Sequence, residues 1–299
     1  MPHVINIVVS SMVFTALLLV VGVGTFRHLT LAVVRRRGSQ AALLAAEPAA
    51  RRAVDIAIVA SLLLLAGVLG RLALAGMLVG TGAGTRAGAP AWSLVIQLGV
   101  TLFVLACYLA IRWSGRGEAA AVIGTVLLAA TPMLSGHAMA SAPFVGLTVL
   151  AGTFHVLGAS GWLGTLTVIL LAGVPATRQL PSSDCDVAVA ELISAFSPAA
   201  LVCAGVVLLS GTFVAWVHLG AGLTLWRSDY GRLLLIKLGV LGLVAGVGSY
   251  NWRLVRPALG CHGGTRRLQR FASLELVMAL VVIVLTAMLV GVPLPVSGA

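Results

Sequence analysis

Two imidazoles and one thioether lie within residues 134–156 of an otherwise apolar chain. His137 and Met139 are two residues apart shortly before Pro143, and His155 follows inside an apolar run. Imidazole nitrogen and thioether sulfur suit copper, whereas the carboxylates that would favour Ca²⁺ or Mg²⁺ are missing from this stretch. We therefore predict that His137, Met139 and His155 are copper ligands, for Cu(I) or Cu(II).

The elements that carry these residues must be transmembrane helices. Mean hydropathy is +1.11, and 9% of the residues are charged, which is far from the composition of a soluble chain. A bilayer core of about 30 Å needs about 20 apolar residues per helix. The fold class predicted is an all-α membrane protein, a polytopic bundle of about eight transmembrane helices. The expected spans are 4–26, 54–78, 92–111, 119–136, 143–172, 195–218, 231–250 and 271–292.

The arginines orient this bundle. Fourteen of the 19 Lys and Arg residues fall in the connections after the first, third, fifth and seventh expected spans, including the cluster 35–37. The positive-inside rule places these residues in the cytoplasm, so both termini are expected to be extracytoplasmic. This explains the net charge of +11 without nucleic acid as a partner; the partner is the lipid bilayer.

His155 is then a group at membrane depth. It lies about twelve residues from the expected outer end of its span, which is about 18 Å at 1.5 Å per residue. Polar groups at that depth are costly and usually face a bundle interior or a water-filled cavity, so His155 is a functional candidate. The alternative is a neutral imidazole bonded to a backbone carbonyl across a helix contact. We expect His155 near the floor of a funnel, with Met139 at the rim and His137 as the outer ligand.

Five further residues are secondary candidates, and each also has a structural interpretation. Tyr230 and Arg232 are typical interface anchors. Lys237 is expected to have a structural or gating role, because a protonated ammonium has no lone pair for a metal. The remaining two are His218, at the outer end of its span, and Trp162, seven residues after His155 on the same expected helix face.

Other classes of site are not indicated. The four cysteines lack CxxC spacing, so neither a disulfide framework nor a structural zinc site is predicted. No nucleophile–base–acid set, phosphate-binding loop or HExxH helix appears, and we expect the protein not to be an enzyme. Glu275 lies near the expected inner end of the last span, where it is expected to pair with Arg270.

Several motifs resemble one membrane-protein family. The segments are SGHA (135–138), FHVLGASGWLG (154–164), DYGRLLLIK (229–237) and LQRFASLELVMALVVIVLTAMLVGVP (268–293). In this order and spacing they resemble the CopD copper-resistance membrane proteins. The resemblance covers about residues 134–293, whereas the first 130 residues are similar in span number and general character.

The resemblance implies a multi-pass protein of the bacterial inner (plasma) membrane that handles copper for homeostasis or resistance. It implies copper uptake or translocation from the periplasmic side, with a CopC-type extracytoplasmic carrier as a partner. The family's histidines fall on His137 and His155, and its YGR…K motif falls on Tyr230, Arg232 and Lys237. The chain is expected to be one integral membrane domain, 1–299, with an N-terminal four-helix half, 1–133, and a CopD-like half, 134–293.

Two alternatives stay open from the residues alone. Intramembrane histidines can ligate a b-type haem in an electron-transfer protein, which needs two imidazoles facing each other. The chain can also be a structural or assembly subunit whose histidines are helix-packing groups. The sequence leaves the transport direction, the oxidation state of copper, the energy source and the oligomeric state open.

Overall fold

The computed structural model describes residues 2–80, 91–134, 144–219, 228–250 and 264–290, together with residues 253 and 292. All regular elements in these ranges are helical, which confirms the all-α prediction. The main helices in chain order are α1 (Pro2–Thr25), η1 (Phe26–Thr30), α2 (Leu31–Arg37), α3 (Gln40–Gly80), α4 (Ala91–Ser114), α5 (Glu118–Ala130), η2 (Thr131–Leu134), α6 (Val145–Ala159), η4 (Ser160–Gly164), α7 (Thr165–Val168), η5 (Ile169–Gly173), α8 (Val174–Thr177), α9 (Ser182–Leu219), α11 (Asp229–Tyr250) and α12 (Gly264–Val290).

Within these ranges, seven helical segments are long and apolar enough to cross a membrane, and Glu118–Leu134 is a shorter apolar helix. Each corresponds to one of the eight spans expected from hydropathy. The polytopic membrane prediction is therefore confirmed, with the fourth segment shorter than its neighbours.

Several helix ends differ from the expected ones. The first span continues through η1 and α2 to Arg37, α3 already begins at Gln40, and α9 begins at Ser182. Residues 27–53 and 182–194 were expected to connect spans and are largely helical, because hydropathy marks where apolar residues end and not where the helical hydrogen bonds end. The arginines of the first connection therefore project from helices.

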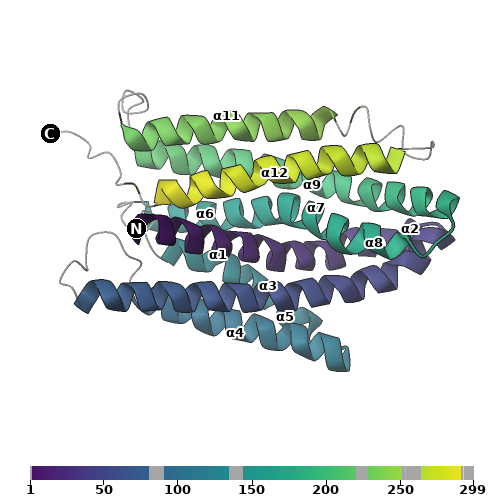
Figure 1. Ribbon diagram of the computed structural model, residues 1–299, viewed down its shortest axis with the longest axis horizontal. Coiled ribbons are helices and arrows are strands. Elements are labelled where there is room, and N and C mark those ends of the chain that lie inside the picture. The colour runs from purple at the N-terminus through teal and green to yellow at the C-terminus, as the bar shows by residue number, and fades with distance from the viewer. Residues whose placement is uncertain are drawn as a thin grey trace.

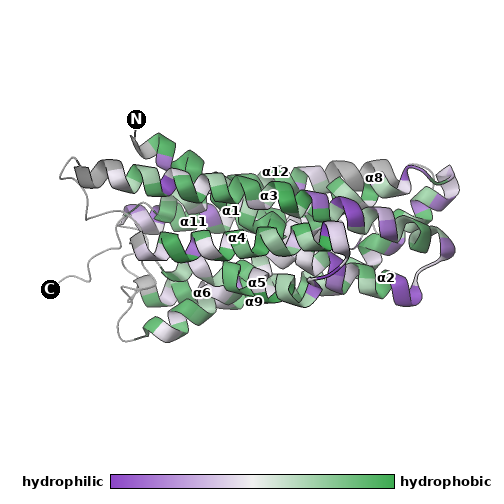
Figure 2. Ribbon diagram, turned by 90° about the horizontal axis from the view of Figure 1, so that it is seen from below, coloured by the Kyte–Doolittle hydropathy of each residue, from purple (hydrophilic) through white to green (hydrophobic). Residues whose placement is uncertain are grey.

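The helices run roughly parallel to one long axis, and α1 begins at the same end of the bundle at which α12 ends (Figure 1). Helix α1 contacts α3, α5, η4, α7 and α12, whereas α11 lies at the edge against α12. Hydrophilic residues gather near the end that carries α2 and α8, and the middle of the bundle is predominantly hydrophobic (Figure 2). This is the pattern expected of a protein that spans a membrane.

A very close helix contact joins α1 to the fifth span. A Cβ added at Gly22 would overlap the backbone of Gly164, and one added at Gly164 would overlap the carbonyl oxygen of Leu18. The Thr165 hydroxyl donates a hydrogen bond to the Gly22 carbonyl oxygen at 3.2 Å. In lipid, where apolar burial gives little drive for helix association, such close approach supplies dispersion contacts and cross-helix hydrogen bonds.

The fifth span is irregular beyond this contact. Two π-helical turns, η4 and η5, interrupt it, and Pro175 follows shortly after η5. Proline lacks the N–H that would continue the hydrogen-bond ladder, so the preceding turn has one carbonyl without its usual partner. The wide turns change the helix phase, so side chains after Ser160 face different neighbours from those that strict 3.6-residue periodicity predicts.

We expect Gly164→Ala to destabilise the protein, because the new methyl group overlaps backbone atoms that cannot move independently. The cost should be about 1–3 kcal/mol, as for other overpacked interiors. Gly99→Ala is the matched control, because an added Cβ meets nothing within 4 Å at that position. Thermal unfolding in detergent should show a lower midpoint for Gly164→Ala and no loss for Gly99→Ala. Equal midpoints would contradict the packing argument.

Candidate functional site

His155 lies in the middle of α6 and is partly buried. The described helix begins at Val145, so His155 is ten residues from its outer end, or about 15 Å along the axis at 1.5 Å per residue. The sequence predicted about 18 Å because it started the span at residue 143. The imidazole is thus slightly shallower than expected but still lies within the span.

The ring of His155 faces α9. Its Nδ1 lies 3.1 Å from the Val207 carbonyl oxygen and 3.3 Å from the Ser210 hydroxyl oxygen. The Ser210 hydroxyl itself donates to the Val206 carbonyl oxygen at 2.5 Å. Because a carbonyl oxygen can accept but not donate, Nδ1 carries the proton. The unprotonated Nε2 is then the nitrogen with a lone pair.

Helix α9 has no side chain at the position that the ring covers. A Cβ added at Gly211 would lie 3.0 Å from Cε1 and 3.2 Å from Nδ1 of His155. Any larger residue there would push the imidazole away from Val207. Gly211 and Ser210 together therefore fix the ring orientation.

Lys237 is the charged group that acts on this imidazole. It lies eight residues, about 12 Å, into α11 from Asp229, close enough to His155 for an electrostatic interaction. The two residues therefore lie on different helices within electrostatic range of each other. A protonated ammonium does not coordinate metal, so its effect on the site is through charge.

Trp162 engages a second polar centre deeper in the bundle. Its indole lies close enough to act as a donor to the carboxyl group of Glu275 in α12, and Glu275 is 3% exposed. A Cβ added at Gly248 of α11 would lie 3.2 Å from the carboxyl oxygen of Glu275. The carboxyl of Glu275 therefore faces the interior of the bundle, about three turns along α12 from Gly264. Its expected position near the inner membrane interface stays a prediction.

The side chain of Arg270, the partner expected for Glu275, lies outside the described residues. Trp162 also packs beside Leu163, Val244 and Ala279. The hydrogen bonds of His155 are with α9, and Lys237 of α11 acts on it electrostatically. Trp162 packs against Val244 of α11 and Ala279 of α12, and also against the main core. The seven-residue spacing that suggested one shared cavity therefore leads to two neighbouring centres.

The outer candidates are placed only in part. His137 and Met139 lie outside the described residues, and His218 lies in the last turn of α9 with its side chain outside them. Their joint role with His155 stays a prediction. Tyr230 is buried against Leu234 and Leu289, which is the behaviour of a packing residue.

Arg232 is largely solvent- or lipid-exposed and lies 3.9 Å from Asp229, one turn earlier. This is the arrangement expected of an interface anchor. Arg232 and Tyr230 therefore extend from the same helix as Lys237 without a recorded contact to the imidazole.

Two sulfur atoms near the fifth span escaped the sequence analysis. Met133 of η2 occupies the space beside Gly152, one turn before His155, and the Cys203 Sγ would lie 2.7 Å from a Cβ at Gly161. Within the described residues, no group of three or more His, Cys, Asp or Glu side chains gathers. Gly152 and Gly161, three residues before and six after His155, are the sequence signal for these two close contacts. The position of a glycine does not say which side chain will fill the space beside it.

The haem hypothesis requires a second imidazole opposite His155. The recorded partners of its Nδ1 are a carbonyl and a hydroxyl, and the side chains of His3, His137 and His218 lie outside the described residues. The hypothesis stays open on these contacts, and it gains no specific support from them.

We expect Trp162→Phe to destabilise the protein by about 1–3 kcal/mol, because it leaves the buried carboxyl of Glu275 without its indole donor. The double variant Trp162→Phe/Glu275→Leu should recover part of this loss by removing the unpaired acceptor. Trp216→Phe is the control, since Trp216 is exposed on α9. Thermal unfolding of the parent, Trp162→Phe, Glu275→Leu, the double variant and Trp216→Phe in one detergent tests this. Additive effects of Trp162→Phe and Glu275→Leu would contradict it.

Helices that surround His155 belong to a segment that is similar to a known family. Residues 190–289 match the family model Copper resistance protein D (CopD), and no curated protein or solved structure matches the chain. The match contains the α9 residues that hold the imidazole of His155, together with Lys237 of α11 and Glu275 of α12. The resemblance stated from the motifs is thereby confirmed for this part of the chain: residues 190–289 form a segment similar to the CopD copper-resistance proteins, within a multi-pass membrane protein.

Proposed function

We propose that the protein moves copper across the membrane, taking the ion from the periplasmic side of the bacterial inner membrane for copper homeostasis or resistance. Copper is the cargo in this proposal, and His155 is its ligand within the bundle. No catalysed covalent reaction is part of the function that we propose.

One observation carries the proposal, the hydrogen bond from Nδ1 of His155 to the Val207 carbonyl oxygen at 3.1 Å. Histidines that ligate metals usually donate their other ring N–H to a carbonyl or carboxylate, which fixes both the tautomer and the ring orientation. Here that bond leaves Nε2 unprotonated and therefore able to bind an ion. Val207 belongs to the CopD-matching segment, whereas His155 precedes it.

Lys237 supports transport in preference to storage. A positive charge close to His155 would weaken the retention of a copper ion by electrostatic repulsion. Conduction needs sites that bind an ion strongly enough to admit it and weakly enough to release it. We therefore assign Lys237 a gating role.

The outer end of the pathway rests on His137 and Met139. We propose that these donors receive copper from a CopC-type extracytoplasmic carrier and pass it toward His155. An imidazole and a thioether are suited to receiving Cu(I), because soft sulfur ligands prefer that oxidation state.

We expect His155→Ala to lose stoichiometric copper, because it removes the only nitrogen ligand that the described part of the bundle offers at this depth. Ser210→Ala should weaken copper binding about tenfold, as outer partners of metal-ligating histidines generally do. His28→Ala is the control, since His28 lies at the opposite end of the bundle, 3.3 Å from Glu118. Metal analysis of the purified proteins after copper loading and desalting measures the result. Full copper content in folded His155→Ala would contradict the proposal.

We expect Lys237→Arg to preserve copper binding, because the positive charge is retained and neither side chain supplies a lone pair. Lys237→Met should bind copper at least as tightly and release it more slowly, because the repulsion is removed. Copper flux into proteoliposomes, measured beside equilibrium binding, separates the two effects. Loss of stoichiometric copper in folded Lys237→Arg would identify Lys237 as part of the binding site and contradict the gating role.

A further inference from the structure

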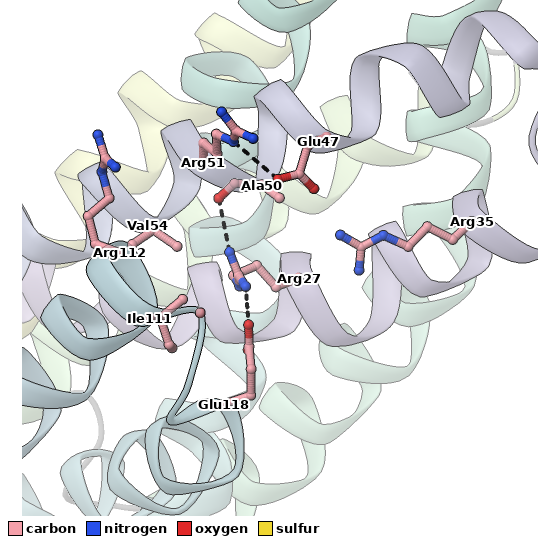
Figure 3. A pocket seen from close by; sticks show the side chains of 10 residues that line it. Arg27, Arg35, Glu47, Ala50, Arg51, Val54, Ile111, Arg112 and Glu118 are labelled. Atoms are coloured by element: carbon pink, nitrogen blue, oxygen red, sulfur yellow. Dashed lines mark hydrogen bonds and ion pairs between the residues drawn. The ribbon is translucent and has the colours of Figure 1, made fainter.

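A basic cavity lies at the end of the bundle opposite to the expected copper entrance. It has a volume of about 320 Å³, and its wall is formed by η1, α2, α3 and α4 with the start of α5. Its lining includes four arginines and two glutamates, beside an aliphatic part formed by Ala50, Val54 and Ile111 (Figure 3). The arginines are Arg27, Arg35, Arg51 and Arg112.

Arg27 forms the most buried charged part of this wall. Its side chain is 14% exposed and pairs with Glu118, and its Nη1 donates to the Ala50 carbonyl oxygen at 3.0 Å. Its Nε is buried without a recorded partner. Arg27 lies in the π-helical turn η1, a wide turn of a kind that occurs frequently at functional sites.

The other acids in the cavity region are also paired. Arg51 Nε lies 3.1 Å from a carboxyl oxygen of Glu47, and Arg112 Nε lies 2.9 Å from a carboxyl oxygen of Asp55. Arg35 has no ion pair among the described residues, and its side chain extends back toward Arg27 (Figure 3). The cavity therefore keeps an excess of positive charge after its internal pairs are counted.

Exposed arginine pairs usually keep donors for further acceptors. A guanidinium has five N–H donors in a planar fork that matches phosphate oxygens. The pairs of Arg51 and Arg112 are made through Nε, so their terminal nitrogens keep donors for an additional anion. A metal cation is disfavoured here, because four arginines surround the space.

We propose that this cavity binds a phosphate group, held by Arg35, Arg51 and Arg112 over the aliphatic wall. The chemistry is shared by the phosphodiester of an anionic lipid headgroup and by free inorganic phosphate. Two features favour the lipid. The cavity lies at the polar end of apolar spans, on the side that the positive-inside rule assigns to the cytoplasm, and its aliphatic wall suits the glycerol and first methylenes of a lipid. Basic pockets between transmembrane helices on this side bind such headgroups in other proteins.

Native mass spectrometry of the delipidated full chain, titrated with phosphatidylglycerol, phosphatidylcholine or inorganic phosphate, tests the proposal. We expect phosphatidylglycerol to bind more tightly than phosphatidylcholine, with Arg35→Gln reducing its affinity about fivefold and Arg35→Gln/Arg112→Gln about 25-fold. Arg178→Gln is the matched control, because Arg178 is an exposed arginine at the same end of the bundle and does not line the cavity. It should leave the affinity unchanged.

The Arg35→Gln variant is expected to fold like the parent protein. Arg35→Gln breaks no ion pair among the described residues, so the variant should be monodisperse with the unfolding midpoint of the parent protein. Arg35→Lys/Arg112→Lys keeps the charge but loses the fork, and its affinity should fall between that of the parent and that of the glutamine variants.

Each outcome decides the proposal. Binding of phosphatidylglycerol that depends on Arg35 supports the lipid source, and inorganic phosphate that displaces it, or binds alone with the same dependence, supports the phosphate site with a free anion as its source. Equal affinity for phosphatidylglycerol and phosphatidylcholine without phosphate binding would overturn the proposal. An equal loss in Arg178→Gln and Arg35→Gln would overturn it as well, because it would assign the effect to overall charge.

Discussion

The contact between Gly22 and Gly164 is the constraint on which the rest of the bundle depends. In lipid, two apolar helices have little to gain by leaving the hydrocarbon, so their association relies on close packing and on hydrogen bonds between them. The absence of a side chain at both positions lets α1 meet η4 at backbone distance, and the Thr165 hydroxyl adds a bond to the Gly22 carbonyl. This contact joins the first span to the fifth and so holds the two expected halves together.

The position of the fifth span then determines the neighbours of His155 and Trp162. Because α6 is held against α1 on one side and α9 on another, the imidazole meets Val207 and Ser210, while the π-helical turn η4 redirects Trp162 toward Glu275. Polar groups at membrane depth need partners inside the protein, since lipid supplies none. His155 and Trp162, both on the fifth span, find such partners on the CopD-matching helices.

The sequence predicted the fold more completely than the site. Long apolar runs leave few alternatives to membrane helices, so the all-α class and the eight segments follow from hydropathy. Helix ends such as Gln40 and Ser182 were placed too far along the chain, because helical hydrogen bonding continues into polar residues. The motifs, among them residues 229–237, indicated the CopD resemblance from the sequence alone, and the match over residues 190–289 agrees with it.

Partners across helices could not be predicted in the same way. The spacing of His155 and Trp162 specifies relative directions on one regular helix, but η4 changes the phase between them, and nothing in the local sequence specifies that α9 faces one ring and α12 the other. Glu275 was assigned to the interface because its depth was counted from the end of the apolar run. That count says nothing of the neighbour that buries the carboxyl, which the structure identifies as Gly248 of α11.

The site residues are divided between the helix that carries His155 and the CopD-matching segment. The imidazole of His155 belongs to a helix that precedes the family match, whereas the carbonyl that fixes its tautomer, the nearby ammonium of Lys237 and the deeper carboxyl of Glu275 all lie within the match. The ligand that we propose on one segment and its supporting groups on another can act together only if their relative position is rigid, because a shift of an ångström would break the bond to Val207. Helix α1 provides that rigidity, since it packs on η4 and α7 of the fifth span and on α12 of the CopD segment. The N-terminal half is thus more than a membrane anchor: it holds the helix that bears the histidine in register with the helices that orient it.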